Sequence, residues 1–300
     1  MRASRQISIS DRFFLLEEIG RGGTSLVYLA DDLLQLHRCA VKVLLPELVL
    51  RSDLRHRFIS EARIMAELRH PAILQVFDWG QSELGPYMAT EHASGGSIEA
   101  WVRRNGPMPP RHAVGVTLQI CAGLTEAHLH GIVHRDIKPD NVLISQQGSC
   151  RIADFGIARV RETTERITST GTRLGTQGFM APEQVERARH VDERADIYGI
   201  AATLWFLLLG HVPTHAFVED PWRAGIPGPL VPVVARATAF RPCDRHDSVA
   251  LLASELSGAM ERLEPLPPDV LPLAPLPELP DRLSSDALAD RGPQPTWSER

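Results

Sequence analysis

The stretch that most constrains this chain is His134–Asn141, which reads His-Arg-Asp-Ile-Lys-Pro-Asp-Asn. Residues 113–129 before it repeat apolar side chains with the spacing of a helix, and Val142–Ile144 after it form an apolar run typical of a buried strand. The sequence therefore predicts a polar loop between a helix and a strand. Such a loop brings an acid, a base and an amide within reach of one another, as proton-transfer catalysis requires.

A second short motif, Asp154-Phe155-Gly156, begins thirteen residues beyond Asn141. The two motifs in this order resemble the signature of protein kinases, H-R-D-L-x-x-x-N followed by D-F-G. Ile137 stands where the signature has Leu, and it keeps that position apolar.

The resemblance covers residues 13–263 and implies an α+β, bilobal protein kinase fold, with a small β-rich N-lobe and a larger helical C-lobe. We assign residues 13–90 to the N-lobe and residues 91–263 to the C-lobe. Residues 1–12 are expected to form a polar lead-in. Nine of the last 37 residues, 264–300, are proline, which is typical of an extended, flexible tail. A docking segment for a proline-reading partner is the alternative for this tail.

A glycine-rich stretch, Gly20-Arg21-Gly22-Gly23-Thr24-Ser25, lies between strands predicted at 13–19 and 26–30. With Val27 it resembles the kinase loop G-x-G-x-x-G-x-V, whose backbone N–H groups approach phosphate oxygens where a Cβ would hinder them. Ser25 replaces the third glycine of that pattern. By itself the stretch also fits a glycine-rich hairpin turn.

A lysine and a glutamate further along the chain also fit the kinase pattern. Residues 39–44 predict a third strand, in which Ala40 and Lys42 share one face. Residues 53–69 have helical spacing, with Glu61 beside an apolar stripe. The resemblance places both residues in the catalytic set and pairs Glu61 with Lys42. An exposed strand lysine and a surface glutamate are the alternatives.

Two further strands are predicted at 73–79 and 87–91, which gives the N-lobe five strands. The segment Thr90–Ala93 resembles the kinase hinge, whose backbone binds adenine, with Thr90 as the gatekeeper. The resemblance therefore implies ATP as the cofactor. The contacts that it implies are Gly20, Arg21, Gly22, Gly23, Val27, Ala40, Lys42, Glu91, Ala93 and Leu143.

The resemblance also gives chemical roles to the loop. Asp136 would orient the acceptor hydroxyl and take its proton, and Lys138 would meet the γ-phosphate as charge develops. Asn141 and Asp154 would hold Mg²⁺, which prefers oxygen ligands. The stretch Lys138–Asn141, Lys-Pro-x-Asn, resembles the loop of serine/threonine kinases, since tyrosine kinases usually have Arg and Ala in this part of the loop.

Two other carboxylates receive structural roles. Residues 192–209 predict a buried helix with Asp196 near its start, and the kinase resemblance implies that this Asp holds the backbone of the catalytic loop. Glu183 ends the A-P-E motif at 181–183 and is expected to pair with Arg245.

Residues 154–183 resemble the kinase activation segment. Within it, Thr168 and Thr170 are spaced like the T-x-T pair of bacterial Hanks-type kinases, which makes them candidate phosphorylation sites. Arg135 directly precedes Asp136, where an Arg can pair with a phosphate on this segment and order it. A solvated polar loop is the alternative.

Composition disfavours several other classes. The net charge of −5 creates no overall field that favours nucleic acid. The four cysteines form no C-x-x-C, which indicates reduced thiols in the cytoplasm. We expect no signal peptide and no transmembrane segment, because the most apolar run, 197–209, is shorter than the about 20 residues that span a bilayer. A metal site at His128, His130 and His134 is disfavoured, because Gly131 breaks the helix between them.

The sequence thus predicts a cytoplasmic serine/threonine protein kinase of bacterial Hanks type, with protein substrates, regulation by autophosphorylation and a homodimer during that step. A pseudokinase-like scaffold that binds nucleotide and partner proteins is the alternative, supported only by Ser25 and a shortened region at 210–231. It is disfavoured because Lys42, Asp136 and Asp154 are all present. A small-molecule phosphotransferase is disfavoured by the A-P-E end of the segment and its tandem Thr.

Overall fold

The computed structural model describes residues 8–155, 177–186, 191–213 and 224–265. Contacts between residues divide them into two units, one formed by residues 8–55 and 76–92 and the other by residues 56–75 and 93–265. Each unit is described by itself. Among the described residues, no helix is long and apolar enough to cross a membrane.

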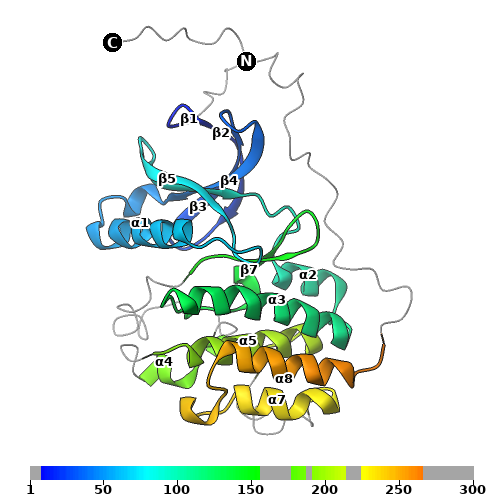
Figure 1. The fold of residues 1–300 in the computed structure, drawn as a ribbon. Coiled ribbons are helices and arrows are strands. Elements are labelled where there is room, and N and C mark those ends of the chain that lie inside the picture. Colours follow the sequence, from blue (N-terminus) through cyan, green and yellow to red (C-terminus); the bar gives the residue numbers. More distant parts are fainter. Residues whose placement is uncertain (1–7, 156–176, 187–190, 214–223, 266–300) are drawn as a thin grey trace, which may run out of the picture. The chain divides into compact units, whose positions relative to one another are not determined.

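The first unit is an antiparallel sheet of six strands in the order β1-β2-β3-β4-β6-β5 (Figure 1). Its strands are β1 (Ser8–Ile9), β2 (Phe13–Arg21), β3 (Ser25–Asp32), β4 (His37–Leu44), β5 (Val76–Ser82) and β6 (Gly85–Glu91), with a short 3₁₀ turn η1 (Pro46–Leu48).

One face of this sheet forms an apolar core. Alternate residues of β4, Cys39, Val41 and Val43, are buried there together with Tyr87 and Ala89 of β6. Because side chains alternate along a strand, Ala40 and Lys42 lie on the opposite face, where both are half-buried. The predicted period of two is therefore confirmed for β4.

The lead-in differs from the prediction, because β1 adds a sixth strand within residues 8–12. Ile9 is fully buried in the core of the sheet. Arg12 bonds the carboxylate of Asp32 at 2.7 Å and that of Asp78 at 3.2 Å, which ties the start of β2 to the end of β3 and to β5. These contacts make residues 8–12 part of the folded unit rather than a polar lead-in.

The strand predicted at 73–79 begins later, at Val76. The residues before it pair elsewhere: Leu74 N–H donates to the carbonyl of Ile152 at 2.9 Å, and Ile152 N–H donates to the carbonyl of Ala72 at 2.8 Å. A run of β-branched and apolar residues indicates extended backbone, but it does not say which partner strand supplies the hydrogen bonds.

In the described residues of the second unit, the regular elements are helices apart from the hairpin of β7 (Val142–Ile144) and β8 (Cys150–Ile152). The division between the units falls within α1 (Ser52–Glu67). The other helices are α2 (Ile98–Asn105), α3 (Pro110–Leu129), α4 (Pro182–Glu186), α5 (Arg194–Leu209), α7 (Val231–Ala237) and α8 (Val249–Glu261), with 3₁₀ turns η2 (Pro139–Asn141), η4 (Gln177–Phe179), η5 (Gly228–Leu230) and η6 (Pro242–Asp244).

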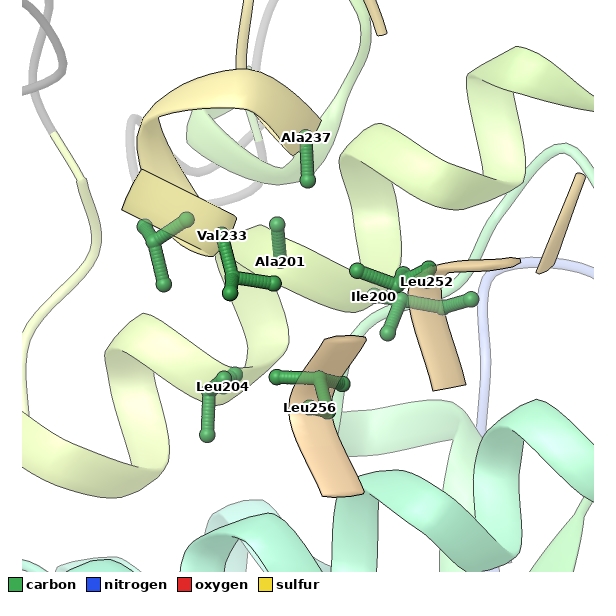
Figure 2. A pocket seen from close by; sticks show the side chains of 8 residues that line it. Ile200, Ala201, Leu204, Val233, Ala237, Leu252 and Leu256 are labelled. Carbon is green, nitrogen blue, oxygen red and sulfur yellow. The ribbon is translucent and has the colours of Figure 1, made fainter. Parts of the chain in front are cut away.

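Helix α5 lies at the centre of this unit, with α3 on one side and α7 on the other (Figure 1). It is apolar around its whole circumference and almost entirely buried, as expected for a core helix. Its last turn closes at Gly210, whose φ of 74° suits glycine at a helix end. Apolar side chains of α5, α7 and α8 meet in Figure 2 and leave no room for a water molecule between them. This region is packed core, not a ligand site.

Candidate active site

The predicted loop follows the end of α3 and leads through η2 into β7. It places His134 in a fully buried position and leaves Arg135, Asp136 and Lys138 half-buried. Arg135 has a φ of 65°, in the left-handed region that non-glycine residues rarely occupy. Such a conformation costs about 1–2 kcal/mol and persists where the surroundings fix it.

Asp196 provides that support. Its fully buried carboxylate accepts the backbone N–H of His134 at 2.8 Å and the backbone N–H of Arg135 at 2.7 Å. It also accepts a hydrogen bond from Nε2 of His128 at 2.8 Å. Nδ1 of His128 in turn lies 3.3 Å from the carboxylate of Glu193. The predicted role of Asp196 in holding the loop backbone is therefore confirmed.

The imidazole of His134 is held in one tautomer. Nε2 bonds the carbonyl of Ala153 at 3.0 Å, and a carbonyl can only accept. Nδ1 bonds the N–H of Asp136 at 3.2 Å, and an N–H can only donate. The ring is therefore neutral with its proton on Nε2, and burial lowers the pKa of His134 accordingly. It packs against Phe155 with ring centroids 4.5 Å apart.

Asp136 is the centre of a polar group. Its Oδ2 lies 3.3 Å from Nζ of Lys138 and accepts a hydrogen bond from Nδ2 of Asn141 at 3.0 Å. The same amide nitrogen donates to the backbone carbonyl of Asp136 at 2.8 Å. The structure thus brings together three of the residues that the sequence singled out.

The hairpin of β7 and β8 brings Asp154 to the end of the hairpin at which Asn141 lies. Val142 pairs with Ile152, and Ala153 N–H donates to the carbonyl of Asn141 at 2.8 Å. Asn141 precedes β7 and Asp154 follows β8, so the two metal-ligand candidates lie at the same end of the hairpin. Asp154 is exposed and has a φ of 55°, a second left-handed residue in the site.

Arg245 anchors the A-P-E motif through its last residue, Glu183. The fully buried guanidinium donates to both carboxylate oxygens of Glu183, at 2.6 and 2.7 Å. It also donates to the backbone carbonyls of Ala239, Arg194 and Phe240, so all three nitrogens of the guanidinium are hydrogen-bonded. The predicted pairing of Glu183 with Arg245 is confirmed.

In the first unit, three of the candidate nucleotide contacts, Val27, Ala40 and Lys42, share one face of the sheet. Val27 lies directly opposite Lys42, and Ala40 lies opposite Thr90. The turn before them is shorter than predicted, because β2 continues through Gly20 and Arg21. Gly22 N–H then donates to the carbonyl of Ser25 at 2.8 Å. Gly23 has no atom within 4 Å of where a Cβ would stand, so its backbone is open.

Comparison with known proteins decides the family. The model of the family described as "Protein kinase domain" matches residues 13–222. The chain belongs to the protein kinase family. Its fold is therefore the α+β, bilobal kinase fold that the sequence predicted.

Its relatives are bacterial serine/threonine kinases of Hanks type. The kinase is 37% identical to serine/threonine-protein kinase PknB of Mycolicibacterium smegmatis over 284 residues, which cover 88% of this chain and 45% of PknB. It is 34% identical to PknL of Mycobacterium tuberculosis, covering 85% of this chain and 67% of PknL. The crystal structure of the M. tuberculosis PknI kinase domain matches with a TM-score of 0.66 and 26% identity, covering 86% of this chain and all (100%) of that one. The chain thus spans less than half the length of PknB.

Some candidate residues of the kinase are not brought together by the described contacts. Lys42 belongs to the first unit and Glu61 to the second, so their pairing remains a prediction. Glu91 lies in the first unit, and Ala93 and Leu143 lie in the second. The predicted phosphorylation sites Thr168 and Thr170 lie outside the described residues.

Two contacts of the loop were not assigned from the sequence. His128 was considered only as a metal ligand, yet its ring bonds two carboxylates. Gln184 was not singled out, yet its side chain reaches the catalytic loop. The sequence offered a signal for His128: it lies at the end of the helix predicted at 113–129, six residues before His134 and therefore close to the loop. It offered none for Gln184 beyond its position after A-P-E.

Proposed function

We propose that this kinase transfers the γ-phosphate of ATP to serine or threonine hydroxyls of proteins. The observation that carries the proposal is the group formed by Asp136, Lys138 and Asn141 at the end of the hairpin that also carries Asp154. Phosphoryl transfer depends on positioning and on electrostatic stabilisation rather than on covalent chemistry, so such a fixed polar group suits it.

Each residue of the group has a distinct task. Asp136 presents a carboxylate that accepts the proton of the acceptor hydroxyl. Asn141 holds that carboxylate through its Nδ2, which fixes the orientation of the carboxylate. Lys138, 3.3 Å from the carboxylate, supplies a positive charge beside the site of transfer.

The residues present also fit a magnesium ion. Nδ2 of Asn141 is committed to Asp136, and among the described residues no group donates to its Oδ1. That amide oxygen and the exposed carboxylate of Asp154 form a pair of hard oxygen donors of the kind that Mg²⁺ prefers. Bound there with ATP, the ion supplies charge neutralisation between phosphate oxygens.

We further propose that phosphate on Thr168 or Thr170 switches the kinase through Arg135. The described contacts of this guanidinium are weak for a partly buried cation. Nη2 donates to the carbonyl of Val191 at 3.3 Å, and the buried Nε has no hydrogen-bond partner among the described residues. A phosphate supplies the acceptor oxygens that such a fork can bind.

The remaining assignments are proposals of the same kind. The kinase domain is taken to run over residues 13–263, and its protein substrates, its homodimer during autophosphorylation and its lack of nucleic-acid partners follow from the sequence prediction. Its four cysteines are free, which suits action in the cytoplasm. The scaffold alternative is not favoured, because the family and the relatives are those of serine/threonine kinases.

Incubation of the purified chain with Mg²⁺ and ATP, followed by phosphosite mapping by mass spectrometry, tests both proposals. Phosphate on Thr168 or Thr170 is expected, and its appearance is expected to raise transfer to an added protein substrate. Arg135→Ala is expected to keep basal transfer but to lose that increase. An increase of the same size in Arg135→Ala would contradict the switch, and no phosphate on any residue would contradict the activity.

A further inference from the structure

The side chain of Gln184, in α4, bonds the backbone at both ends of its amide. Oε1 accepts the N–H of Ala181 at 3.0 Å, and Nε2 donates to the carbonyl of Arg135 at 2.8 Å. A backbone N–H can only donate and a carbonyl can only accept. The two partners therefore fix which end of the amide points to the catalytic loop.

The carbonyl that Gln184 binds belongs to the peptide unit between Arg135 and Asp136. The N–H on the other side of the same unit is that of Asp136, which donates to Nδ1 of His134 at 3.2 Å. Both polar groups of the Arg135–Asp136 peptide unit, the carbonyl and the N–H, are thus hydrogen-bonded. Asp196 holds the preceding peptide unit through the N–H of Arg135.

This support matters because Arg135 has a left-handed φ of 65°. Release of its carbonyl frees the Arg135–Asp136 peptide plane to rotate about the Cα–C bond of this strained residue, and the Cα of Asp136 turns with it. One hydrogen bond of this kind contributes a free energy comparable to the cost of the left-handed conformation.

The position of Gln184 is itself fixed by its neighbour. Glu183 is bound through both carboxylate oxygens to the buried Arg245, at 2.6 and 2.7 Å. Gln184 follows immediately in α4, so its side chain starts from a firmly held backbone. Helix α4 begins within A-P-E, at the end of the segment 154–183 that resembles the kinase activation segment, so this amide links the C-terminal end of that segment to the catalytic loop.

We propose that Gln184 is a positioning residue that sets the Arg135–Asp136 peptide unit, and that α4 acts on Asp136 through it. The proposal rests on the proposed function only for the task of Asp136. The hydrogen bonds themselves do not depend on that function.

Two substitutions test the proposal from different directions. Gln184→Glu keeps the length of the side chain but sets carboxylate oxygens against the carbonyl of Arg135. Gln184→Met keeps the volume and removes both hydrogen bonds. We expect each to lower kcat about tenfold, the equivalent of one hydrogen bond, and to leave KM for ATP within about twofold. Gln147→Glu is the matched control, because it makes the same chemical change at an exposed position in the turn between β7 and β8.

The second readout is amide hydrogen exchange at Asp136, compared with a core amide of α5 such as that of Leu204. Faster exchange at Asp136 with unchanged exchange at Leu204 is expected in both variants, because only the loop is released. Wild-type kcat in both variants would overturn the proposal, as would a lower kcat with unchanged exchange at Asp136. If the unsubstituted chain transfers no phosphate, the proposed function fails, while exchange at Asp136 still decides the role of Gln184.

Discussion

The carboxylate of Asp196 accepts the backbone N–H of Arg135 at 2.7 Å and thereby holds a left-handed residue directly before the candidate catalytic Asp136. The carboxylate lies at the start of α5, the most deeply buried of the helices described in its unit. The geometry of the loop is therefore set by the core of the second unit.

Asp196→Asn tests this support. The amide has one acceptor oxygen where the carboxylate has two, so its NH₂ group must face at least one of the three N–H donors that Asp196 now satisfies. We expect the free energy of unfolding to fall by about 1–3 kcal/mol and kcat to fall at least about tenfold. Urea unfolding and steady-state kinetics measure the two effects. Asp247→Asn, at a side chain that is 70% exposed, is the control and should match the wild type in both. Equal behaviour of the two variants would contradict the role of Asp196.

Arg245→Lys tests the anchor of the A-P-E motif. A lysine cannot reproduce the two-pronged contact with Glu183 or reach all three carbonyls, so buried acceptors lose their partners. We expect a loss of about 3–5 kcal/mol in the free energy of unfolding, the cost typical of breaking a buried pair. Arg236→Lys provides the comparison, because its pair with Glu255 lies at the surface and should cost less than about 1 kcal/mol. If Arg245→Lys lowered the free energy of unfolding by no more than Arg236→Lys, the role of the buried guanidinium would be contradicted.

Gly199→Ala tests how closely α5 approaches the loop. A Cβ at Gly199 would stand 2.9 Å from the carbonyl oxygen of Ile137 and 3.0 Å from its Cβ. Ile137 must therefore move, and it lies between Asp136 and Lys138. We expect lower kcat together with about 1–3 kcal/mol of destabilisation from overpacking. Gly258→Ala makes the same change inside α8, where a Cβ meets nothing within 4 Å, and should stabilise the helix slightly. Similar effects at the two glycines would count against a close approach.

The neutral tautomer of His134 predicts a pH dependence. Burial lowers the pKa of His134 below its ordinary value of about 6.5, so below that pH the unfolded chain binds a proton that the folded chain does not. This contribution to stability is complete above about pH 6.5 and declines as pH falls toward the lower pKa of the folded state. Urea unfolding at about pH 7.5 and about pH 5.5 measures it. His134→Gln, which cannot titrate, should lose less stability over that interval than the wild type. Parallel losses in the two proteins would contradict the assignment.

Much of the site could be predicted because its residues are fixed by motifs with strict spacing. The loop, the anchor Asp196 and the pair of Glu183 with Arg245 were all expected from the sequence, and the structure has the contacts described above. The helices and strands around them were predicted by periodicity, which reports the direction in which side chains point.

The features that were missed depend on contacts rather than on pattern. The strand β1 was taken for part of a polar lead-in, because only one of its two residues, Ile9, is apolar. Arg12 contributed to this prediction, because the sequence does not show that its guanidinium pairs with carboxylates of the sheet. Ile73 and Leu74 were assigned to the wrong strand, since they pair with Ile152 instead. Gln184 was missed because an amide gains its role only from the backbone groups it meets.

The role of Asp136 is tested most directly by comparing ATP binding and phosphate transfer in Asp136→Asn with those in the wild type. The proposed mechanism predicts transfer to protein serine or threonine in the wild type. In Asp136→Asn it predicts a loss of about 10²–10⁴-fold, the contribution typical of a positioned base, with the Kd for ATP within about twofold. Asp247→Asn, far along the chain and exposed, should transfer phosphate normally. Transfer by Asp136→Asn at the wild-type rate would contradict the mechanism.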